Sequence, residues 1–362
     1  YIQRPAVEAK VLGLFAKPRP DGRMPRLVSI IGFGGMGKTR LAVACALQAV
    51  ALFDGDHDDG VYFVRLDDRL PTKESLAEAI GAAFGWIGEA ALPDRFLAAL
   101  RERNSLLVFD NFETVDSDDS RQFVARLITE TRHLRLLVTG REAVKLDDAE
   151  HLVDGDDPRN HMTAAEAREL FVERARQKRG ADWSPDERDE ATIGRIIELT
   201  DHIPLALELA AAWVGHKSLD EIAAGIAATP LGAETAQPPR HGRIGPDRHR
   251  SLTRCLDWSF QLLEPAAQEA FARFGVFADS FTADAARTVC DLPDADTMLS
   301  RLQDASLLRR SEVASQSRYE LNRFTRSYAA EKLDALPVSD AVRQRFVNHY
   351  RELVVAHHHI ND

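Results

Sequence analysis

The stretch GFGGMGKTR, residues Gly32–Arg40, determines how the rest of this sequence is interpreted. It matches the phosphate-binding pattern G-x-x-x-x-G-K-[ST] at Gly32, Gly37, Lys38 and Thr39. The apolar run 27–31 precedes it and is a predicted strand, which is the context that a P-loop requires. A glycine-rich turn without a ligand would need the strand, the spacing, the lysine and the threonine to coincide by chance.

The P-loop interpretation gives each part of this stretch a chemical role. Glycines let the backbone curl so that successive N–H groups point at one phosphate, and the helix that begins near Lys38 adds the positive end of its dipole. Lys38 would neutralise the β- and γ-phosphates of ATP, and the Thr39 hydroxyl would hold Mg²⁺. The other predicted nucleotide-binding residues of the loop are Gly34, Gly35, Met36, Gly37 and Arg40.

Length and composition set broad limits on the protein. A chain of 362 residues suggests two or three domains. The net charge of −11 argues against coating of nucleic acid or binding to a membrane surface by the whole chain. No run of about 18 apolar residues occurs, so we expect no membrane-spanning segment. The chain begins at Tyr1 without a methionine, and we expect it to be a fragment of a longer polypeptide.

The three cysteines are Cys45, Cys255 and Cys290, and they form no C-x-x-C pair. An odd, scattered set is typical of a reducing compartment, so the sequence predicts a cytoplasmic protein. Cys45 lies one helical turn after Leu41, and we interpret it as a small buried apolar residue.

Strand and helix signals alternate from residue 26 onward, which predicts an α/β domain with a parallel sheet covered on both faces. Ligands bind such sheets at the carboxyl ends of the strands. The predicted strands are 27–31, 61–66, 105–109, 134–139 and 151–153. The predicted helices are 38–52, 72–85, 93–103 and 118–131, after an amphipathic stretch at 6–15.

Two strand ends supply further candidates for the same edge of the sheet. The run SLLVFDNFE delivers Asp110 at the end of a buried strand, where an acid opposite Thr39 would support Mg²⁺. Asn111 follows at the position where many hydrolases carry a second acid, so fast hydrolysis is not expected; Glu113 could substitute or be a surface residue. The run LLVTGRE ends at Arg141, which could sense the γ-phosphate or be a surface arginine.

Helical patterns dominate after residue 163. Segments 163–179 and 189–215 are predicted helices, with Pro204 opening a helix at its first turn. The Pro-, Gly- and Arg-rich segment 229–249 is a predicted linker. Helices at 251–263, 265–274, 282–290 and 295–304, followed by β-like runs 307–310 and 318–321, have the layout of a winged helix. Helices at 325–335 and 339–357 complete the pattern.

Two polar segments resemble metal sites without fitting one. The loop 54–60, DGDHDDG, lacks the glycine and the bidentate glutamate at calcium-loop spacing, so we interpret it as a solvated turn. The adjacent histidines His357, His358 and His359 cannot face one site on a helix, and they are interpreted as a helix end.

Taken in order, these motifs resemble the STAND class of signal-transduction ATPases, in particular the NB-ARC type of immune receptors, apoptosome proteins and bacterial regulators. The resemblance rests on GFGGMGKTRLA, LLVFDNFE, LLVTGRE, HIPLALELAAA and the segments from LDWSFQLLEP to RFTRSYAAEKL, roughly six-sevenths of the chain. It implies a P-loop domain, a small helical domain and a winged-helix domain that hold ADP in a closed state. The predicted division is 1–25, an N-terminal segment; 26–158, the P-loop domain; 159–230, helical; 231–250, linker; 251–336, winged helix; and 337–362, a further helical region.

The resemblance also assigns roles to individual residues. Lys38, Asp110, Asn111 and Arg141 form the implied catalytic set, and Thr39 and Asp110 the implied Mg²⁺ ligands. Pro204 and Leu205 would lie on the adenine side, although His202 replaces the glycine of the usual G-x-P-L-A pattern. In YIQRPAVE, Arg4 matches an arginine that contacts the nucleotide. Asn322 replaces the histidine that holds the ADP β-phosphate, and Arg326 matches an arginine of the bacterial members.

The predicted function is therefore an ADP/ATP-controlled switch that hydrolyses ATP slowly. ATP in place of ADP would release the winged helix, expose an oligomerisation surface between copies of the chain and activate an effector, expected in the same polypeptide, in response to an unknown trigger. Two alternatives stay open. One is a transcription regulator that reads DNA with Arg248, Arg250 and Arg254, although the nearby acids Asp257, Glu264 and Glu269 disfavour it. The other is a P-loop kinase or hydrolase of metabolism, which would turn over rapidly.

Overall fold

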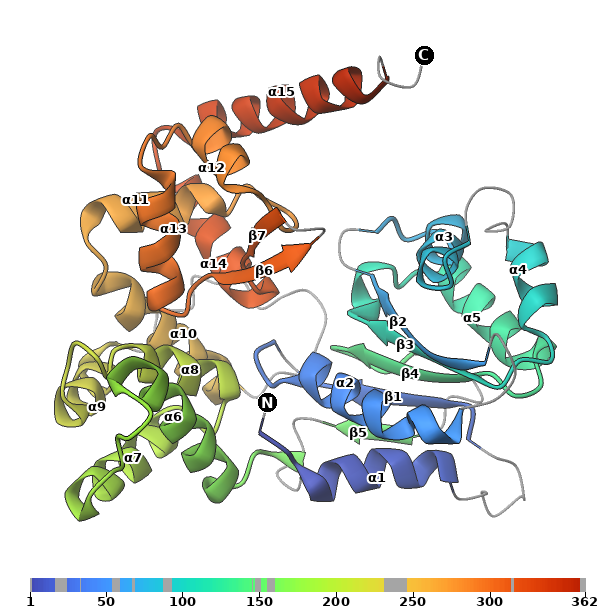
Figure 1. Cartoon of the computed structure of the whole chain (residues 1–362), viewed down its shortest axis with the longest axis horizontal. Coiled ribbons are helices and arrows are strands. Elements are labelled where there is room, and N and C mark those ends of the chain that lie inside the picture. The colour runs from blue at the N-terminus through green and yellow to red at the C-terminus, as the bar shows by residue number, and fades with distance from the viewer. Residues whose placement is uncertain are drawn as a thin grey trace. The chain divides into compact units, whose positions relative to one another are not determined.

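The computed structural model describes residues 2–16, 25–32, 34–53, 59–66, 69–86, 93–144, 146, 151–154, 160–230, 246–313 and 316–358. The chain divides into two compact units (Figure 1). The N-terminal unit consists of Tyr1–Glu166 with Glu234–His249, and the C-terminal unit of Ala167–Ala233 with Arg250–Asp362. Within the described ranges, no helix has both the length and the apolar character needed to cross a membrane.

A five-stranded parallel sheet forms the centre of the N-terminal unit, in the order β2-β3-β4-β1-β5. Its strands are β1 (Leu27–Ile31), β2 (Gly60–Arg65), β3 (Ser105–Asp110), β4 (Arg135–Gly140) and β5 (His151–Asp154). All the predicted strands are present, with bounds that differ from the prediction by no more than one residue. The inner strand β3 is buried at every position because helices cover both faces of the sheet, which is why its sequence is an uninterrupted apolar run.

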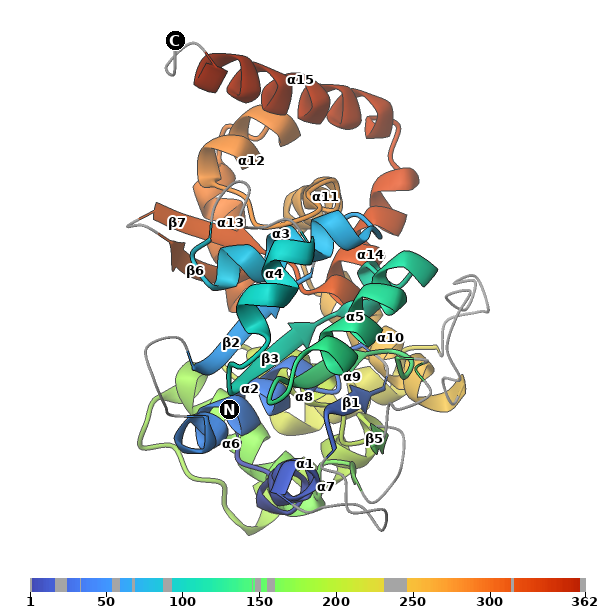
Figure 2. The ribbon, with the colours of Figure 1, turned by 90° about the vertical axis from the view of Figure 1, so that its right-hand side faces the viewer.

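Helices on the two faces bury alternate residues of the strands. Figure 2 shows the layers from the side. Leu106 and Val108 pack with α1 (Pro5–Ala16) and α2 (Lys38–Ala49), whereas Leu107 and Phe109 pack with the helices of the other face. Those are α3 (Lys73–Ala83), α4 (Pro93–Leu100) and α5 (Asp118–Glu130). The predicted P-loop NTPase fold of this unit is confirmed in this arrangement of a parallel sheet and flanking helices.

The C-terminal unit begins with a group of four helices: α6 (Ala164–Arg179), α7 (Glu187–Leu199), α8 (Pro204–Ala212) and α9 (Leu219–Ala228). The predicted helical segment 189–215 is divided into α7 and α8, and Pro204 is the first residue of α8, as predicted from its fixed φ. Helix α9 was absent from the prediction. Its N-terminus carries a capping box in which Ser218 and Glu221 bond each other's backbone N–H groups.

The rest of the C-terminal unit contains α10 (Pro246–Gln261), α11 (Pro265–Phe274), α12 (Ala283–Cys290), α13 (Ala295–Asp304), the antiparallel hairpin of β6 (Arg309–Val313) and β7 (Gln316–Glu320), α14 (Arg323–Asp334) and α15 (Ser339–His358). The predicted helices and β-like runs are present here, with α10 beginning inside the predicted linker. Its interior is aromatic: Phe277 stacks on Phe281, whose backbone exchanges two hydrogen bonds of 2.8 Å with Tyr319 of the hairpin.

Polar contacts join the α6–α9 group to the helices and hairpin that follow it. The carboxylate of Glu208 on α8 accepts from Arg174 of α6 at 3.2 Å and lies 3.6 Å from the guanidinium of Arg309 on β6. The Nζ of Lys178 lies 3.1 Å from Asp304 at the end of α13. The C-terminal unit is therefore held together by ion pairs as well as by its apolar core.

Candidate functional site

The loop after β1 has the backbone conformation that its glycines permit. Gly35 and Gly37 have φ values of 85° and 80°, in the left-handed region that is costly for residues with a Cβ. Gly37 is also the N-cap of α2, which then begins at Lys38. The Lys38 ammonium donates to the carbonyl oxygen of Gly32 at 2.7 Å, so the side chain folds back over the loop that it follows.

A chain of hydrogen bonds connects the loop to the ends of β3 and β4. The Thr39 hydroxyl donates to Asp110 Oδ1 at 2.8 Å and lies 3.1 Å from Oδ2. The Thr139 hydroxyl donates to the same Oδ1 at 2.6 Å. Asp110 is 3% exposed, so this carboxylate is held almost out of water by the groups that bond it. The predicted pair Thr39 and Asp110 is thus in direct contact.

Asn111 and Arg141 take positions at the same edge of the sheet. Asn111 has φ 60° and ψ 49°, a left-handed conformation that asparagine tolerates better than most residues. Its backbone N–H donates to Thr139 Oγ1 at 3.0 Å, and its side-chain amide lies 3.5 Å from Asp110 Oδ2. Arg141 Nε lies 3.6 Å from Glu113 Oε1, and both side chains are mostly buried.

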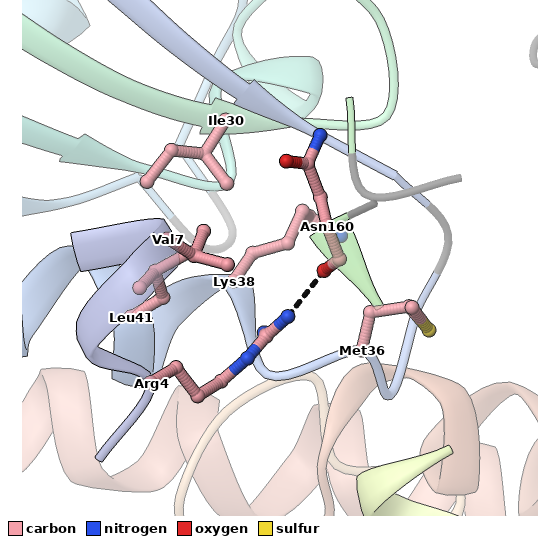
Figure 3. Close-up of a pocket in the computed structure, with 7 residues that line it drawn as sticks. All are labelled: Arg4, Val7, Ile30, Met36, Lys38, Leu41 and Asn160. Atoms are coloured by element: carbon pink, nitrogen blue, oxygen red, sulfur yellow. Dashed lines mark hydrogen bonds between the residues drawn. The ribbon is translucent and has the colours of Figure 1, made fainter. Parts of the chain in front are cut away.

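A small pocket lies beside the loop, and residues of both the loop and the N-terminal segment line it. Figure 3 shows the Arg4 guanidinium extending to the backbone carbonyl of Asn160, to which it donates a hydrogen bond. The pocket is lined by Arg4, Val7, Ile30, Met36, Lys38, Leu41 and Asn160. It holds about 10 Å³, close to the room of one water molecule. A nucleotide base is far larger than this space.

The structure places Arg4 through a local network that the sequence did not indicate. The backbone N–H of Arg4 donates to Glu8 Oε1 at 2.7 Å, and Gln48 of α2 donates to Glu8 Oε2 at 2.6 Å. Lys10 donates to Asn160 Oδ1 at 2.9 Å. Asn160 was missed because it lies in a loop without a motif. Thr139 was missed as a site residue, although its place at the end of an apolar strand was a usable signal.

The predicted nucleotide-binding residues of the C-terminal unit have roles in their own helices. Pro204 and Leu205 are buried in the first turn of α8. His202, where the family pattern has glycine, has φ 56°, so the left-handed backbone is retained with a histidine. Asn322 caps α14: its Oδ1 accepts from the N–H of Thr325 at 3.0 Å, and its Nδ2 donates to the Thr325 hydroxyl at 2.7 Å. A role for these residues toward a nucleotide stays a prediction.

The donor atoms at the loop fit a magnesium ion. Mg²⁺ prefers oxygen ligands and is usually held by one or two protein oxygens together with substrate phosphates and water. Thr39 and Asp110 offer a hydroxyl and a carboxylate that already approach each other. Bound there, Mg²⁺ would neutralise phosphate charge. In the part of the chain that the structure describes, no group of three or more His, Cys, Asp or Glu side chains could hold a metal by itself.

The three cysteines are free thiols and all are buried. Burial raises the pKa of Cys45, Cys255 and Cys290 to about 12 in each case, with a smaller contribution from Glu8 at Cys45. At neutral pH they are therefore protonated, and a thiol rather than a thiolate is a poor nucleophile or metal ligand. The interpretation of Cys45 as a small apolar residue is confirmed.

Comparison with known proteins finds relatives that align with most of this chain. No family model matches the chain. The chain is 32% identical over 342 residues to a putative HTH-type transcriptional regulator of Mycobacterium tuberculosis H37Rv, Rv0890c, covering 91% of this chain and 36% of that protein. It is 30% identical over 333 residues to the uncharacterized protein Rv0894 of the same organism, covering 90% of this chain and 81% of that protein. The chain thus spans about a third of the length of the first of these relatives.

A solved structure shares the fold. The STAND protein with a tetratricopeptide repeat sensor PH0952 from Pyrococcus horikoshii aligns with 97% of this chain and 45% of its own, with a TM-score of 0.59 and 14% identity. The fold, together with the loop that follows β1, defines a protein of the P-loop ATPase class. Within that class, the chain belongs to the same family as the mycobacterial protein Rv0894.

Proposed function

We propose that the chain is the nucleotide-controlled switch of a signal-transduction ATPase, with an arrangement of the NB-ARC type. The observation that carries this proposal is the contact of Thr39 with Asp110 beside a loop that has P-loop backbone geometry. These two residues are 71 positions apart in sequence, and they meet only because β1 and β3 end at the same edge of the sheet. Such an edge is where parallel sheets bind ligands.

In the proposed site, each group acts on a part of ATP or ADP. The loop N–H groups and the N-terminus of α2 bind the phosphates, and Lys38 exchanges the Gly32 carbonyl for phosphate oxygens. Thr39 and Asp110 hold Mg²⁺, and Arg141 contacts the γ-phosphate. Arg4 lies beside the ribose and base. Because Arg141 responds to the γ-phosphate alone, ATP and ADP favour different conformations.

The C-terminal unit completes the proposed switch. Its α10–α13 helices and the β6-β7 hairpin form a winged helix, and Asn322 approaches the β-phosphate while Pro204 and Leu205 approach the adenine. ADP then favours a closed state, and ATP an open one in which copies of the chain associate and activate an effector. Slow hydrolysis resets the switch. The solved STAND structure supports this proposal through its fold.

A second function is favoured by the name of a relative, which is a putative HTH-type transcriptional regulator. In this alternative, the switch controls binding to DNA. The basic residues expected to read DNA are Arg248, Arg250 and Arg254, and the Arg254 guanidinium donates to the Leu199 carbonyl at 3.0 Å. That contact favours a packing role for Arg254 and so disfavours reading by this surface. A salt-dependent mobility-shift assay with genomic fragments tests the alternative.

The test of the switch begins with the nucleotide that the protein carries. We expect protein purified without added nucleotide to release about one equivalent of ADP on denaturation, measured by chromatography. Lys38→Ala should weaken ATP and ADP binding by about 100-fold or more, because the phosphates lose their positively charged partner. Lys73→Ala, at an exposed helix start, is the matched control and should bind normally. A wild-type protein that binds neither nucleotide would contradict the proposal.

A further inference from the structure

Glu113 occupies a position at the sheet edge that its sequence context does not reveal. It lies in the 3-10 turn Phe112–Thr114, directly after β3. We infer that the Glu113 carboxylate activates the water that attacks the γ-phosphate of ATP, and that its ion pair with Arg141 restrains it until a γ-phosphate attracts that arginine. This inference rests on the proposed function, because it requires ATP at the P-loop.

The backbone at Asn111 explains how Glu113 reaches this position. A left-handed residue reverses the direction of the chain at the end of β3 and starts the 3-10 turn. The Thr114 hydroxyl fixes the turn by lying 2.8 Å from the Asn111 carbonyl and 2.5 Å from the Leu66 carbonyl. The position of the usual second acid therefore shapes the backbone, and the carboxylate is supplied two residues later.

The neighbours of Glu113 place its carboxylate close to the phosphate loop. β4 lies between β3 and β1, and the Gly140 carbonyl at its end accepts from the N–H of Gly32 at 3.2 Å. A Cβ on Gly140 would lie 3.5 Å from Glu113 Oε2 and 3.1 Å from the Glu142 carbonyl. The first of these distances is an ordinary van der Waals contact, so the Glu113 carboxylate lies directly beside Gly140. In space, Gly140 therefore lies between Glu113 and Gly32, the first residue of the P-loop.

The burial of Glu113 and its pairing with Arg141 are consistent with a general base that is inactive until ATP binds. The side chains of Glu113 and Arg141 are 17% and 20% exposed, and their charged atoms are 3.6 Å apart. The separation of these two atoms exceeds a hydrogen bond, so their interaction is an ion pair. A γ-phosphate carries more negative charge than one carboxylate and would compete for Arg141. Release of Arg141 leaves Glu113 able to accept a proton.

The proposed step is hydrolysis with a balanced transfer of one proton. The water oxygen forms a bond to the γ-phosphorus while the bond from that phosphorus to the β,γ-bridging oxygen breaks, and ADP leaves with the electron pair. The water proton passes to the Glu113 carboxylate and then to the inorganic phosphate. Contributions of a positioned general base are typically about 10²- to 10⁴-fold in rate.

The test compares Glu113→Gln with Glu142→Gln, which removes the exposed carboxylate that directly follows Arg141 in the sequence. Single-turnover hydrolysis is measured with protein in excess over labelled ATP, and ATP and ADP affinities are measured by calorimetry. We expect Glu113→Gln to bind both nucleotides within about threefold of wild type, to hydrolyse ATP about 100-fold more slowly and to retain ATP after purification. Glu142→Gln should match wild type in every measurement.

Glu113→Asp keeps the charge that faces Arg141, so it serves if the glutamine variant does not fold. Its shorter side chain withdraws the carboxylate, and we expect hydrolysis to slow by about tenfold or more with binding retained. Wild-type rates in either folded variant would overturn the assignment. A wild-type protein that binds ATP without any hydrolysis would also overturn it, yet leave the switch intact. A wild-type protein that binds no nucleotide would instead remove the proposed function itself.

Discussion

In the N-terminal unit, the buried Asp110 and Thr139 lie where β3 and β4 end, whereas the buried polar residues of the C-terminal unit lie mostly on helices. Asp110 accepts hydroxyl groups from two other segments of the chain. In contrast, Asn322 bonds the first turn of its own helix, and Glu208 pairs with arginines of α6 and β6. The same kinds of residues thus build a potential ligand site in one unit and hold secondary structure together in the other.

This difference arises from the geometry of the two kinds of element. Parallel strands end at one edge of the sheet, so side chains from residues far apart in sequence meet there. These side chains are not needed as hydrogen-bond partners for the backbone groups of their own strands. Helices instead leave N–H and C=O groups at their ends that nearby side chains must bond. Substitutions in the N-terminal unit should therefore alter ligand binding, and those in the C-terminal unit should alter stability. The predictions below test that separation, beginning with the largest expected effect.

Glu208→Ala should lower the free energy of unfolding by about 3 kcal/mol, because it leaves two guanidinium groups without their shared carboxylate. We expect the lower end of the usual range since the Arg309 side chain is 46% exposed. Urea unfolding followed by circular dichroism measures the change. Glu173→Ala, which removes a more exposed neighbour of Arg174, should change stability by less than about 0.5 kcal/mol. Equal effects would show that Glu208 has no special role.

Asp110→Asn should change stability little and nucleotide binding strongly. The amide oxygen still accepts from Thr39 and Thr139, so unfolding should change by less than about 1 kcal/mol. Loss of the charge should weaken binding of ATP in the presence of Mg²⁺ about tenfold, and binding without Mg²⁺ much less. Calorimetric titrations with and without Mg²⁺ measure this. Loss of stability with unchanged Mg²⁺ dependence would contradict the separation between the units.

Asn322 caps α14 and is also the proposed contact of the ADP β-phosphate. Two substitutions distinguish the capping role from the binding role. Asn322→Ala removes the cap of α14 and should cost about 1 kcal/mol, whereas Asn322→Asp keeps an equivalent cap and should cost almost nothing. If the amide also contacts a β-phosphate, the aspartate variant should bind ADP more weakly than the alanine variant because like charges repel. Unfolding curves and ADP titrations of both variants measure the two roles. Normal ADP affinity in the aspartate variant would leave Asn322 with a capping role alone.

His202→Gly should stabilise the C-terminal unit by up to about 1 kcal/mol. A residue with a Cβ at φ 56° is strained, and glycine removes that strain, although its greater freedom in the unfolded chain offsets part of the gain. Gly194→Ala, at an open position on α7, serves as the reciprocal comparison and should also stabilise. Thermal unfolding measures both. A destabilised His202→Gly variant would mean that the imidazole makes contacts worth more than the strain.

The buried thiols predict a loss of stability at alkaline pH. Burial raises the pKa of Cys255 to about 12, so the folded state binds a proton that the unfolded state releases above pH 9. The stability present below pH 9 is then lost as pH rises toward 12, by about 0.8 kcal/mol per thiol at pH 9.5. Burial raises the pKa of Tyr328 in the same direction. Cys255→Ala should reduce the pH dependence of unfolding, and an unchanged dependence would assign it to other groups.

The N-terminal unit was predictable from sequence because each of its signals is local and strong. A buried parallel strand is a short apolar run, and a P-loop is a fixed spacing that follows one. Helix α9 could also have been predicted, since Ser218 and Glu221 have capping-box spacing and Leu219, Ile222 and Ile226 recur at helical spacing, but the segment is short and Ala-rich. Helix α10 begins earlier than predicted because Pro246 is a favourable first residue of a helix.

Contacts across the sheet edge were not predictable in the same way. The ion pair of Glu113 with Arg141 depends on β3 and β4 being neighbours and on the left-handed conformation of Asn111, and the local sequence indicates neither of these features. The link of Arg4 to Asn160 joins residues 156 positions apart, one of them in a loop without a pattern. The sequence places Asp110 and Arg141 at strand ends, whereas their contacts with Thr139 and Glu113 follow only from the three-dimensional arrangement.

The pocket of about 10 Å³ beside Arg4 and Met36 has a kinetic consequence. In the proposed site, a base enters only after these side chains move, so opening would precede association and have its own rate. The observed rate of nucleotide binding should then rise with concentration and level off at the opening rate, instead of increasing linearly. Exchange of one nucleotide for another would be timed by the protein and not by the supply of ligand.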